Sequence, residues 1–293
     1  MKRKLRFYHP LPRFPSVSIT GSICKLGCDH CKGYYLNNMP DVSTPEKLIE
    51  FCQKHERNDG VGLLISGGST KTGHVPLEPF LRSIEWIKEN TDLILNLHTG
   101  VVNTVQAYDI ASTGVDIVSV DLVGSKETIR NIYGLNYSEK EYMRSLFNLR
   151  DAGVKSIAPH ITVGLDYGEI KGEYTALEYA VRIKPEVIVF LGLIPTKGTP
   201  MENVYPPKIN EIIKLIRVAK EKMPRSSISL GCMRSRIDKY EMEWRAIGAG
   251  VDRIASSTRR VEQKARDTGY DVRIIEGCCS IPESYEKKYN LII

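Results

Sequence analysis

The sequence predicts an α/β protein whose fold is a (β/α)8 TIM-type barrel with a short N-terminal segment and a C-terminal extension. Short runs rich in Val, Ile and Leu alternate with amphipathic helical patterns along the chain, without a linker-like break. Eight such units are expected, and the 293 residues slightly exceed the roughly 250 typical of such a barrel. We therefore expect a single domain over residues 1–293, with residues 270–293 as the C-terminal extension.

The strands are expected to be parallel and buried on both faces, because apolar residues fill them almost continuously. They are Ser16–Thr20, Val61–Ser66, Leu93–His98, Asp116–Leu122, Ser156–Val163, Val187–Ile194, Ser227–Gly231 and Arg253–Ser256, and a further strand-like run, Asp271–Ile275, lies in the extension. Helical patterns, several opened by Ser, Thr or Pro, include Pro45–Arg57, Leu77–Glu89, Ser138–Asp151, Tyr174–Arg182, Pro207–Lys222 and Lys239–Gly248. An open doubly wound sheet obeys the same alternation, but eight near-equal units favour closure.

Composition narrows the classes of protein. The net charge of +6 is mild and spread along the chain, so no nucleic-acid partner is expected. The longest apolar run, Val187–Ile194, is too short to span a membrane. The start MKRKLRFYHP lacks the apolar core of a signal peptide, so we expect a cytoplasmic protein. Seven Cys then indicate metal ligands or reduced thiols rather than a disulfide framework.

Three cysteines, Cys24, Cys28 and Cys31, have C-x3-C-x2-C spacing directly after the first expected strand. This is the end of a barrel strand where catalytic residues lie. Iron–sulfur clusters are normally bound by four thiolates, so three alone predict a [4Fe–4S] cluster with one open iron. Zinc, with His30 as a further ligand, is the alternative, although zinc sites usually show paired C-x2-C or Cys/His knuckles.

The spacing resembles that of the radical S-adenosylmethionine (SAM) superfamily. This resemblance implies that the trio is catalytic: the open iron chelates SAM, which an electron cleaves to a 5′-deoxyadenosyl radical. Gly67, Gly68 and Ser69 follow the second strand and resemble the superfamily's GGE segment, which binds the SAM amino group, with Ser69 where Glu is commonest. Paired glycines allow close backbone approach to a ligand; a plain strand-to-helix turn is the alternative. His30 occupies a usually aromatic position and is implied to pack near adenine.

Polar residues end the later strands. Asp121 is implied to bind the ribose hydroxyls, with capping of the next helix as the alternative. His160 and Thr162 belong to a segment that resembles the superfamily's adenine-contacting strand; His98 and His160 could equally fill the barrel mouth. Pro195 opens a P-T-K-G-T-P-M segment that resembles a turn of the biotin-synthase-like branch. The whole pattern resembles archaeal proteins described as homologues of biotin synthase.

The remaining cysteines suggest a second metal site. Cys232 ends the seventh strand, while Cys278 and Cys279 follow the last helix in the extension. Adjacent thiols pair with each other only with strain, yet both can ligate one cluster. We infer a second iron–sulfur cluster on these three cysteines, with Arg234 or Ser280 as a fourth ligand; three unconnected thiols are the alternative. Cys52 is expected to be a small buried hydrophobe.

A second cluster is what sulfur insertion requires, since a carbon radical attacks one of its sulfides. Biotin synthase takes auxiliary ligands from central strands, and bacterial lipoyl synthase from an N-terminal C-x4-C-x5-C run; neither pattern is found here. The chain resembles archaeal two-component lipoyl synthases. This implies a sulfurtransferase acting on an octanoyl group of a carrier protein or lipoyl domain, with a second radical SAM subunit and an electron donor such as ferredoxin. A biotin synthase-like or other radical SAM reaction on a small molecule, and a non-catalytic iron–sulfur electron carrier, are the alternatives.

Overall fold

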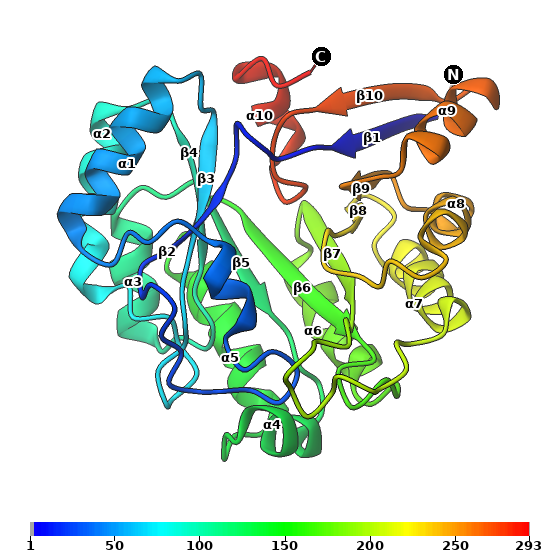
Figure 1. Ribbon diagram of the computed structural model, residues 1–293, viewed down its shortest axis with the longest axis horizontal. Helices are drawn as coiled ribbons and strands as arrows, with labels where there is room; N and C mark the ends of the chain where they lie inside the picture. Colours follow the sequence, from blue (N-terminus) through cyan, green and yellow to red (C-terminus); the bar gives the residue numbers. More distant parts are fainter. Residues whose placement is uncertain (1–2, 293) are drawn as a thin grey trace.

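The computed structural model describes residues 3–292 and contains one ten-stranded sheet, in which every pair of neighbouring strands is parallel. The strands are β1 (Lys4–Tyr8), β2 (Ser16–Ser18), β3 (Gly62–Ser66), β4 (Ile94–His98), β5 (Ile117–Asp121), β6 (Ile157–Val163), β7 (Val187–Gly192), β8 (Ser227–Leu230), β9 (Arg253–Ala255) and β10 (Asp271–Ile275). The helices are α1 (Pro45–Arg57), α2 (Leu81–Asn90), α3 (Thr104–Ser112), α4 (Lys126–Tyr133), α5 (Glu139–Asp151), α6 (Glu173–Ile183), α7 (Ile209–Lys222), α8 (Lys239–Ala249), α9 (Arg259–Asp267) and α10 (Glu283–Lys288), with short 3-10 helices η1 (Tyr34–Asn38) and η2 (Glu78–Phe80). The sheet curls, and most helices cover its outer side (Figure 1).

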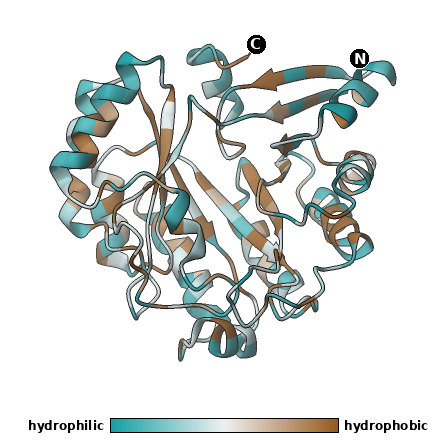
Figure 2. Cartoon of the chain, in the orientation of Figure 1, coloured by the Kyte–Doolittle hydropathy of each residue, from teal (hydrophilic) through white to brown (hydrophobic). Residues whose placement is uncertain are grey.

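Side chains along the strands alternate between two layers, as the pleat of a strand requires. In β4, Leu95 and Leu97 belong to the large outer core beneath the helices, whereas Ile94 belongs to a smaller inner core. Asn96 and His98 share the inner face with Ile94 by the same alternation. Figure 2 shows the apolar strands inside and hydrophilic helix surfaces outside. In the part of the chain that is described, no helix combines the length and hydropathy needed to cross a bilayer.

The expected TIM-type α/β architecture is confirmed, but the sheet has ten strands instead of eight and is not closed among the described residues. Its hydrogen-bonded order runs β10-β1-β9-β8-β7-β6-β5-β4-β3-β2. The additional strand β1 was not expected, because it lies in a basic segment. Pro10, Pro12 and Pro15 separate β1 from β2. Proline has no N–H for a sheet ladder, and this segment forms no strand, although the Arg13 and Pro15 carbonyls accept from Val61 and Leu64 N–H at 2.9 Å.

Most expected elements lie within two residues of the observed ones. The expected helix Leu77–Glu89 is an exception, since it starts with η2 around Pro79 before α2 begins at Leu81. The expected helix Pro207–Lys222 begins at Ile209, after two consecutive prolines. The expected strand Asp271–Ile275 is confirmed as β10, which pairs with β1.

The C-terminal segment, residues 276–292, fills the inner side of the curled sheet. Cys279, Ile281 and Leu291 pack in the inner core against β-strand residues. Helix α10 is anchored by Glu286, which is 1% exposed and lies 3.0 Å from Arg6 Nε and 3.4 Å from Arg253 Nη2. These contacts join the neighbouring strands β1 and β9 to the segment that carries Cys278 and Cys279.

Candidate functional site

The first cysteine triad, Cys24, Cys28 and Cys31, lies on the loop after β2. Gly27 adopts a left-handed conformation with φ of 60°, which favours glycine at this turn. The carbonyl of Cys28 accepts hydrogen bonds from the backbone N–H groups of Cys31 (3.2 Å) and Lys32 (2.8 Å). The loop is therefore a compact turn that keeps Cys28 and Cys31 close together.

The thiols of this triad interact with one another. A hydrogen bond with Cys28 lowers the pKa of Cys31 to about 4, while the same bond, burial and the neighbouring Cys31 and Cys24 charges raise the pKa of Cys28. In residues 3–292, no three His, Cys, Asp or Glu side chains converge closely enough to hold a single metal ion. A cube instead takes one thiolate at each of several irons, so its ligands stand apart. The triad suits a [4Fe–4S] cluster better than a single zinc ion.

The glycine turn after β3 packs directly on the first triad. A Cβ on Gly68 would lie 2.0 Å from the carbonyl oxygen of Ile23 and 2.6 Å from Cys24 Cα, so only glycine fits. The Ser69 carbonyl accepts from Lys25 N–H at 2.9 Å, and Thr20 Oγ1 accepts from Gly68 N–H at 2.7 Å. A Cβ on Gly67 would also be tight, at 3.1 Å from Ile19. This turn brings backbone groups next to Cys24 of the triad.

His30 lies between the triad and the inner face of the sheet. Its ring centroid is 5.6 Å from that of Tyr133, at an angle of 60°. Its Nδ1 is buried without a hydrogen-bond partner. The His30 side chain also interacts with Cys31, whose pKa it helps to lower.

His98, Asp121 and His160 end three neighbouring strands and form one polar group. His98 Nε2 lies 3.4 Å from Asp121 Oδ2, and the two imidazole centroids are 6.0 Å apart. Burial disfavours both charges, but the ion pair outweighs it: the pKa of His98 is raised, and that of Asp121 is lowered to about 2. Burial lowers the pKa of His160 to about 4, so its ring is neutral at pH 7. Its Nδ1 donates to the Ala158 carbonyl at 2.9 Å.

The second triad, Cys232, Cys278 and Cys279, is assembled from distant parts of the chain. A hydrogen bond with Cys279 lowers the pKa of Cys278 to about 6. The pKa of Cys279 is raised by the same hydrogen bond, by burial and by the charges of Cys278 and Cys232. Burial and Cys278 raise the pKa of Cys232, which solvent nevertheless reaches. The three thiols therefore lie in one neighbourhood, of which Cys232 is the exposed member.

Two polar side chains on β8 and β9 lie on the inner side of the sheet that carries the second triad. The Ser229 hydroxyl has no oxygen or nitrogen partner but lies near Cys279, whose pKa it lowers, and Arg253 Nε has no partner although Nη1 of the same group donates to the Ile281 carbonyl. Both residues are 0% exposed and pair with each other across β8 and β9. Buried donors normally find acceptors, so Ser229 beside Cys279 is a donor available to the sulfur at this position.

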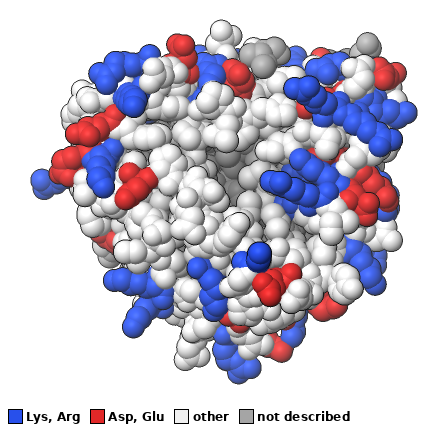
Figure 3. Space-filling model, viewed as in Figure 1, with Lys and Arg blue, Asp and Glu red and all other residues white. Residues whose placement is uncertain are grey.

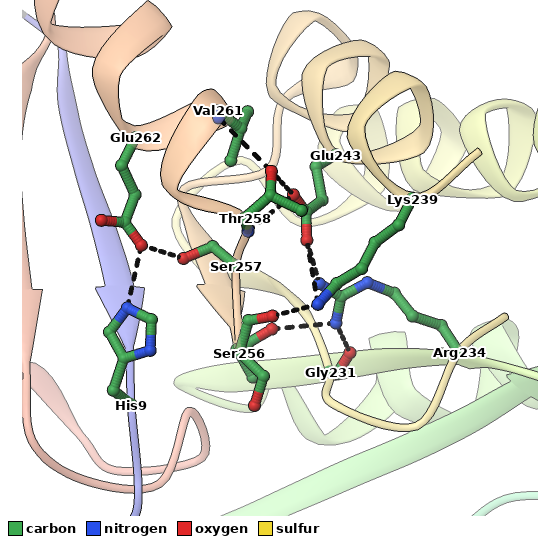
Figure 4. Close-up of polar contacts among 11 residues, drawn as sticks. His9, Gly231, Arg234, Lys239, Glu243, Ser256, Ser257, Thr258, Val261 and Glu262 are labelled. Atoms are coloured by element: carbon green, nitrogen blue, oxygen red, sulfur yellow. Dashed lines mark hydrogen bonds and ion pairs between the residues drawn. The ribbon is translucent and has the colours of Figure 1, made fainter. Parts of the chain in front are cut away.

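The two suggested fourth ligands of the second site differ in their surroundings. Ser280 Oγ lies 3.6 Å from Cys278 Sγ. Arg234 instead forms a buried ion pair with Glu243, and its Nη1 donates to the carbonyls of Gly231 and, at 2.9 Å, Ala255 (Figure 4). Its guanidinium thus braces the loop that carries Cys232.

Other expected residues lie around these groups. Thr162 is half-buried on the inner face of β6, and Pro195 is half-buried beside Thr196, whose hydroxyl bonds Tyr35 at 2.8 Å. Cys52 is 0% exposed in the outer core, as expected of a small hydrophobe. Asn96, Ser229 and Arg253 were not anticipated. Their signal was a polar residue at an inner position of an otherwise apolar strand, which is readable only once the inner face is known.

Comparisons with known proteins identify the family of the chain. Residues 18–171, more than half of the chain, match the radical SAM superfamily model. The chain is similar to the biotin synthase of Vibrio atlanticus (strain LGP32), at 25% identity over 270 residues, covering 89% of this chain and 75% of that protein. The biotin synthase of Pseudoalteromonas translucida (strain TAC 125) is 25% identical over 285 residues, covering 92% and 78%.

Solved structures share the fold. Methylornithine synthase (PylB) superposes with a TM-score of 0.64 at 16% identity, covering 92% of this chain and 83% of that one. HydG, a maturase of the [FeFe]-hydrogenase, superposes with a TM-score of 0.67 at 14% identity over 92% of this chain. The match spans 64% of HydG, less than two thirds of its length. The chain belongs to the radical SAM superfamily, and is an enzyme of the kind that uses a [4Fe–4S] cluster and SAM.

Proposed function

We propose that this radical SAM enzyme is a sulfurtransferase that inserts sulfur at an unactivated C–H bond, with a second iron–sulfur cluster on Cys232, Cys278 and Cys279. The observation that carries the proposal is the grouping of these three mutually interacting thiols on the inner side of the sheet. The Ser229 hydroxyl beside Cys279 supports it.

When bound, the first cluster and SAM supply a radical that removes hydrogen from such a carbon, and the second cluster supplies sulfide. The chain's own residues bind and orient. We assign Gly67, Gly68 and Ser69 to the amino end of SAM and Asp121, charged at neutral pH, to its ribose hydroxyls. His30, His160, Thr162 and Pro195 are assigned to the adenine side. The substrate then occupies the space between the two triads.

As substrate we propose an octanoyl group attached to a carrier protein or lipoyl domain. Ile23, Tyr205 and Ile237 are 66%, 89% and 68% exposed on loops after β2, β7 and β8. The carboxyl ends of parallel strands share one edge, so these side chains give one rim an unusual apolar character. Lys25 and Arg236 are exposed on the same loops, and Figure 3 shows Lys and Arg gathered beside a central hollow. Such a rim suits an acidic protein surface.

A second radical SAM subunit and an electron donor such as ferredoxin complete the proposed system. The second candidate is a biotin synthase-type reaction on a small molecule, which the similarity to two biotin synthases favours. Strands β4 to β7 contain no Cys, in contrast to the central-strand ligands attributed above to biotin synthase. Both candidates share the two triads and differ in substrate.

The test is anaerobic reconstitution, iron and sulfide counting, and reaction with SAM and reductant, with and without added partner subunit. Octanoyl-lysine peptide, octanoylated carrier domain, free octanoate and dethiobiotin are compared by mass spectrometry for added sulfur. Sulfur in the octanoyl peptide or domain alone supports the proposal. Conversion of dethiobiotin with octanoyl substrates left intact identifies the second candidate. SAM cleavage without a second cluster in the wild type contradicts sulfur insertion by either route.

A further inference from the structure

A buried amide lies against the second triad. Asn96, in the middle of β4, is 1% exposed. Its inner-face neighbours Ile94 and Ile117 belong to the apolar inner core. An amide among such residues costs stability unless its polar atoms are bonded, and a Leu or Val would serve packing better. Packing of the core therefore does not explain why an amide occupies this position.

The hydrogen bonds of Asn96 fix the direction of its amide. Ser119 Oγ donates to Asn96 Oδ1 at 3.0 Å. With its oxygen occupied, the amide directs its N–H group the opposite way, and Nδ2 donates to Cys278 Sγ at 3.8 Å. Ser119 is 2% exposed, so water does not compete for the amide oxygen. Ser119 thus sets the orientation that makes Asn96 a donor to sulfur.

The adjacent cysteines meet different strands. Cys278 Sγ contacts Asn96 of β4 and Ser280. Cys279 lies instead near Ser229 of β8, whose hydroxyl lowers the pKa of the thiol. The inner faces of β4 and β8 thus each offer a donor to one of the two sulfurs.

We propose that Asn96, oriented by Ser119, is a positioning residue for the second iron–sulfur centre: its N–H donates to the Cys278 sulfur, holds that ligand toward β4 and raises the reduction potential of the centre. The inference rests on the proposed second centre. A donor at a ligand sulfur stabilises the more negative, reduced state of a cluster. Removing the donor should therefore make reduction harder and loosen the ligand.

The test compares three variants in the full-length reconstituted protein. Asn96→Asp keeps the shape of the side chain but removes the N–H donor, and Asn96→Leu removes the donor without adding charge. Ser119→Ala removes the hydrogen bond that orients the Asn96 amide. The matched control is Asn148→Asp on α5, since Asn148 is half-buried and its Nδ2 donates to the Val102 carbonyl at 3.1 Å, away from both triads. Iron per chain and EPR-monitored redox titration of each centre are measured.

We expect the second centre of both Asn96 variants to have a lower reduction potential or reduced iron occupancy, with a smaller effect in Ser119→Ala and none in the control. The potential of the first centre should not move. A wild type with only one cluster refutes the second centre itself. A wild type with two clusters, and Asn96 variants with unchanged iron and potential, refutes the role of Asn96 and leaves the proposed function standing. If the Asn96 variants do not fold, Ser119→Ala decides: an unchanged potential overturns the inference.

Discussion

The two cysteine triads differ in how the chain builds them. Cys24, Cys28 and Cys31 share one short loop, whose turn is closed by its own backbone hydrogen bonds. Cys232, Cys278 and Cys279 come together only because residues 276–292 fold into the inner side of the sheet. The first triad is therefore a local structure, and the second depends on the whole sheet.

The C-terminal segment that carries Cys278 and Cys279 is held in place by buried contacts to Glu286. Arg6, Tyr8 and Arg253, from β1 and β9, surround Glu286 of α10, and Tyr8 Oη donates to Glu286 Oε1 at 2.5 Å. Arg253 Nη1 also donates to the Ile281 carbonyl at 2.5 Å. A local triad should survive damage at this anchor, whereas an assembled triad should not. This difference can be tested by changing the cysteines of either triad or the contacts of Glu286.

The largest effect is expected at the first triad. Replacing Cys24, Cys28 or Cys31 with Ala should abolish 5′-deoxyadenosine formation, because each removes one of only three cluster thiolates. The fold should persist, since these residues lie on a loop outside the strands. Deoxyadenosine is measured by chromatography and folding by circular dichroism. Continued SAM cleavage in any one variant would contradict the assignment.

Removing the second triad should separate the two reactions. The triple variant Cys232→Ala, Cys278→Ala, Cys279→Ala should lose about one cluster of iron and all sulfur insertion, yet still cleave SAM. Cys52→Ala is the matched control, because Cys52 is a fully buried thiol in the outer core. Unchanged iron and sulfide in the triple variant would rule out the auxiliary site.

Breaking the anchor should disturb only the assembled triad. Glu286→Gln leaves the buried guanidinium of Arg253 without its carboxylate, a change that costs about 3–5 kcal/mol for buried pairs, whereas Arg6 keeps Glu283 at 2.6 Å. We expect faster hydrogen exchange in residues 276–292 and loss of second-site iron, with the first cluster retained. Glu241→Gln, which breaks an exposed pair with Arg245, should cost at most about 1 kcal/mol. Equal loss of both clusters would show that the triads are not independent.

The smallest effect concerns the polar group between the triads. Asp121 raises the pKa of His98 against the opposing effect of burial. The contribution of the His98–Asp121 ion pair to folding stability is thus fully present below the unfolded histidine pKa of about 6.5. It is lost as pH rises through the higher pKa of the folded protein. Asp121→Asn should lower the pKa of His98, measured by NMR of the imidazole nitrogens. An unchanged His98 titration would show that the pair does not form.

The order of helices and strands could be predicted because it depends on local patterns of apolar residues and helix caps. Pro45–Arg57 follows Thr44, whose side chain accepts from Lys47 N–H, and matches the observed α1. The strands were found as apolar runs. Strand β1 was missed because Lys4–Tyr8 gains its strand character from pairing with β9 and β10, which no local pattern reveals.

The sequence by itself determined the first triad, its family and the apolar strands, since each depends on residues close together in the chain. Only the tertiary structure decided that β1 joins β9 and β10, and that the C-terminal segment fills the inner side of the sheet. It also decided which polar side chains meet there, Asn96 with Cys278 among them. The physical reason is that these contacts depend on the register and curvature of strands far apart in sequence, which every intervening element helps to fix.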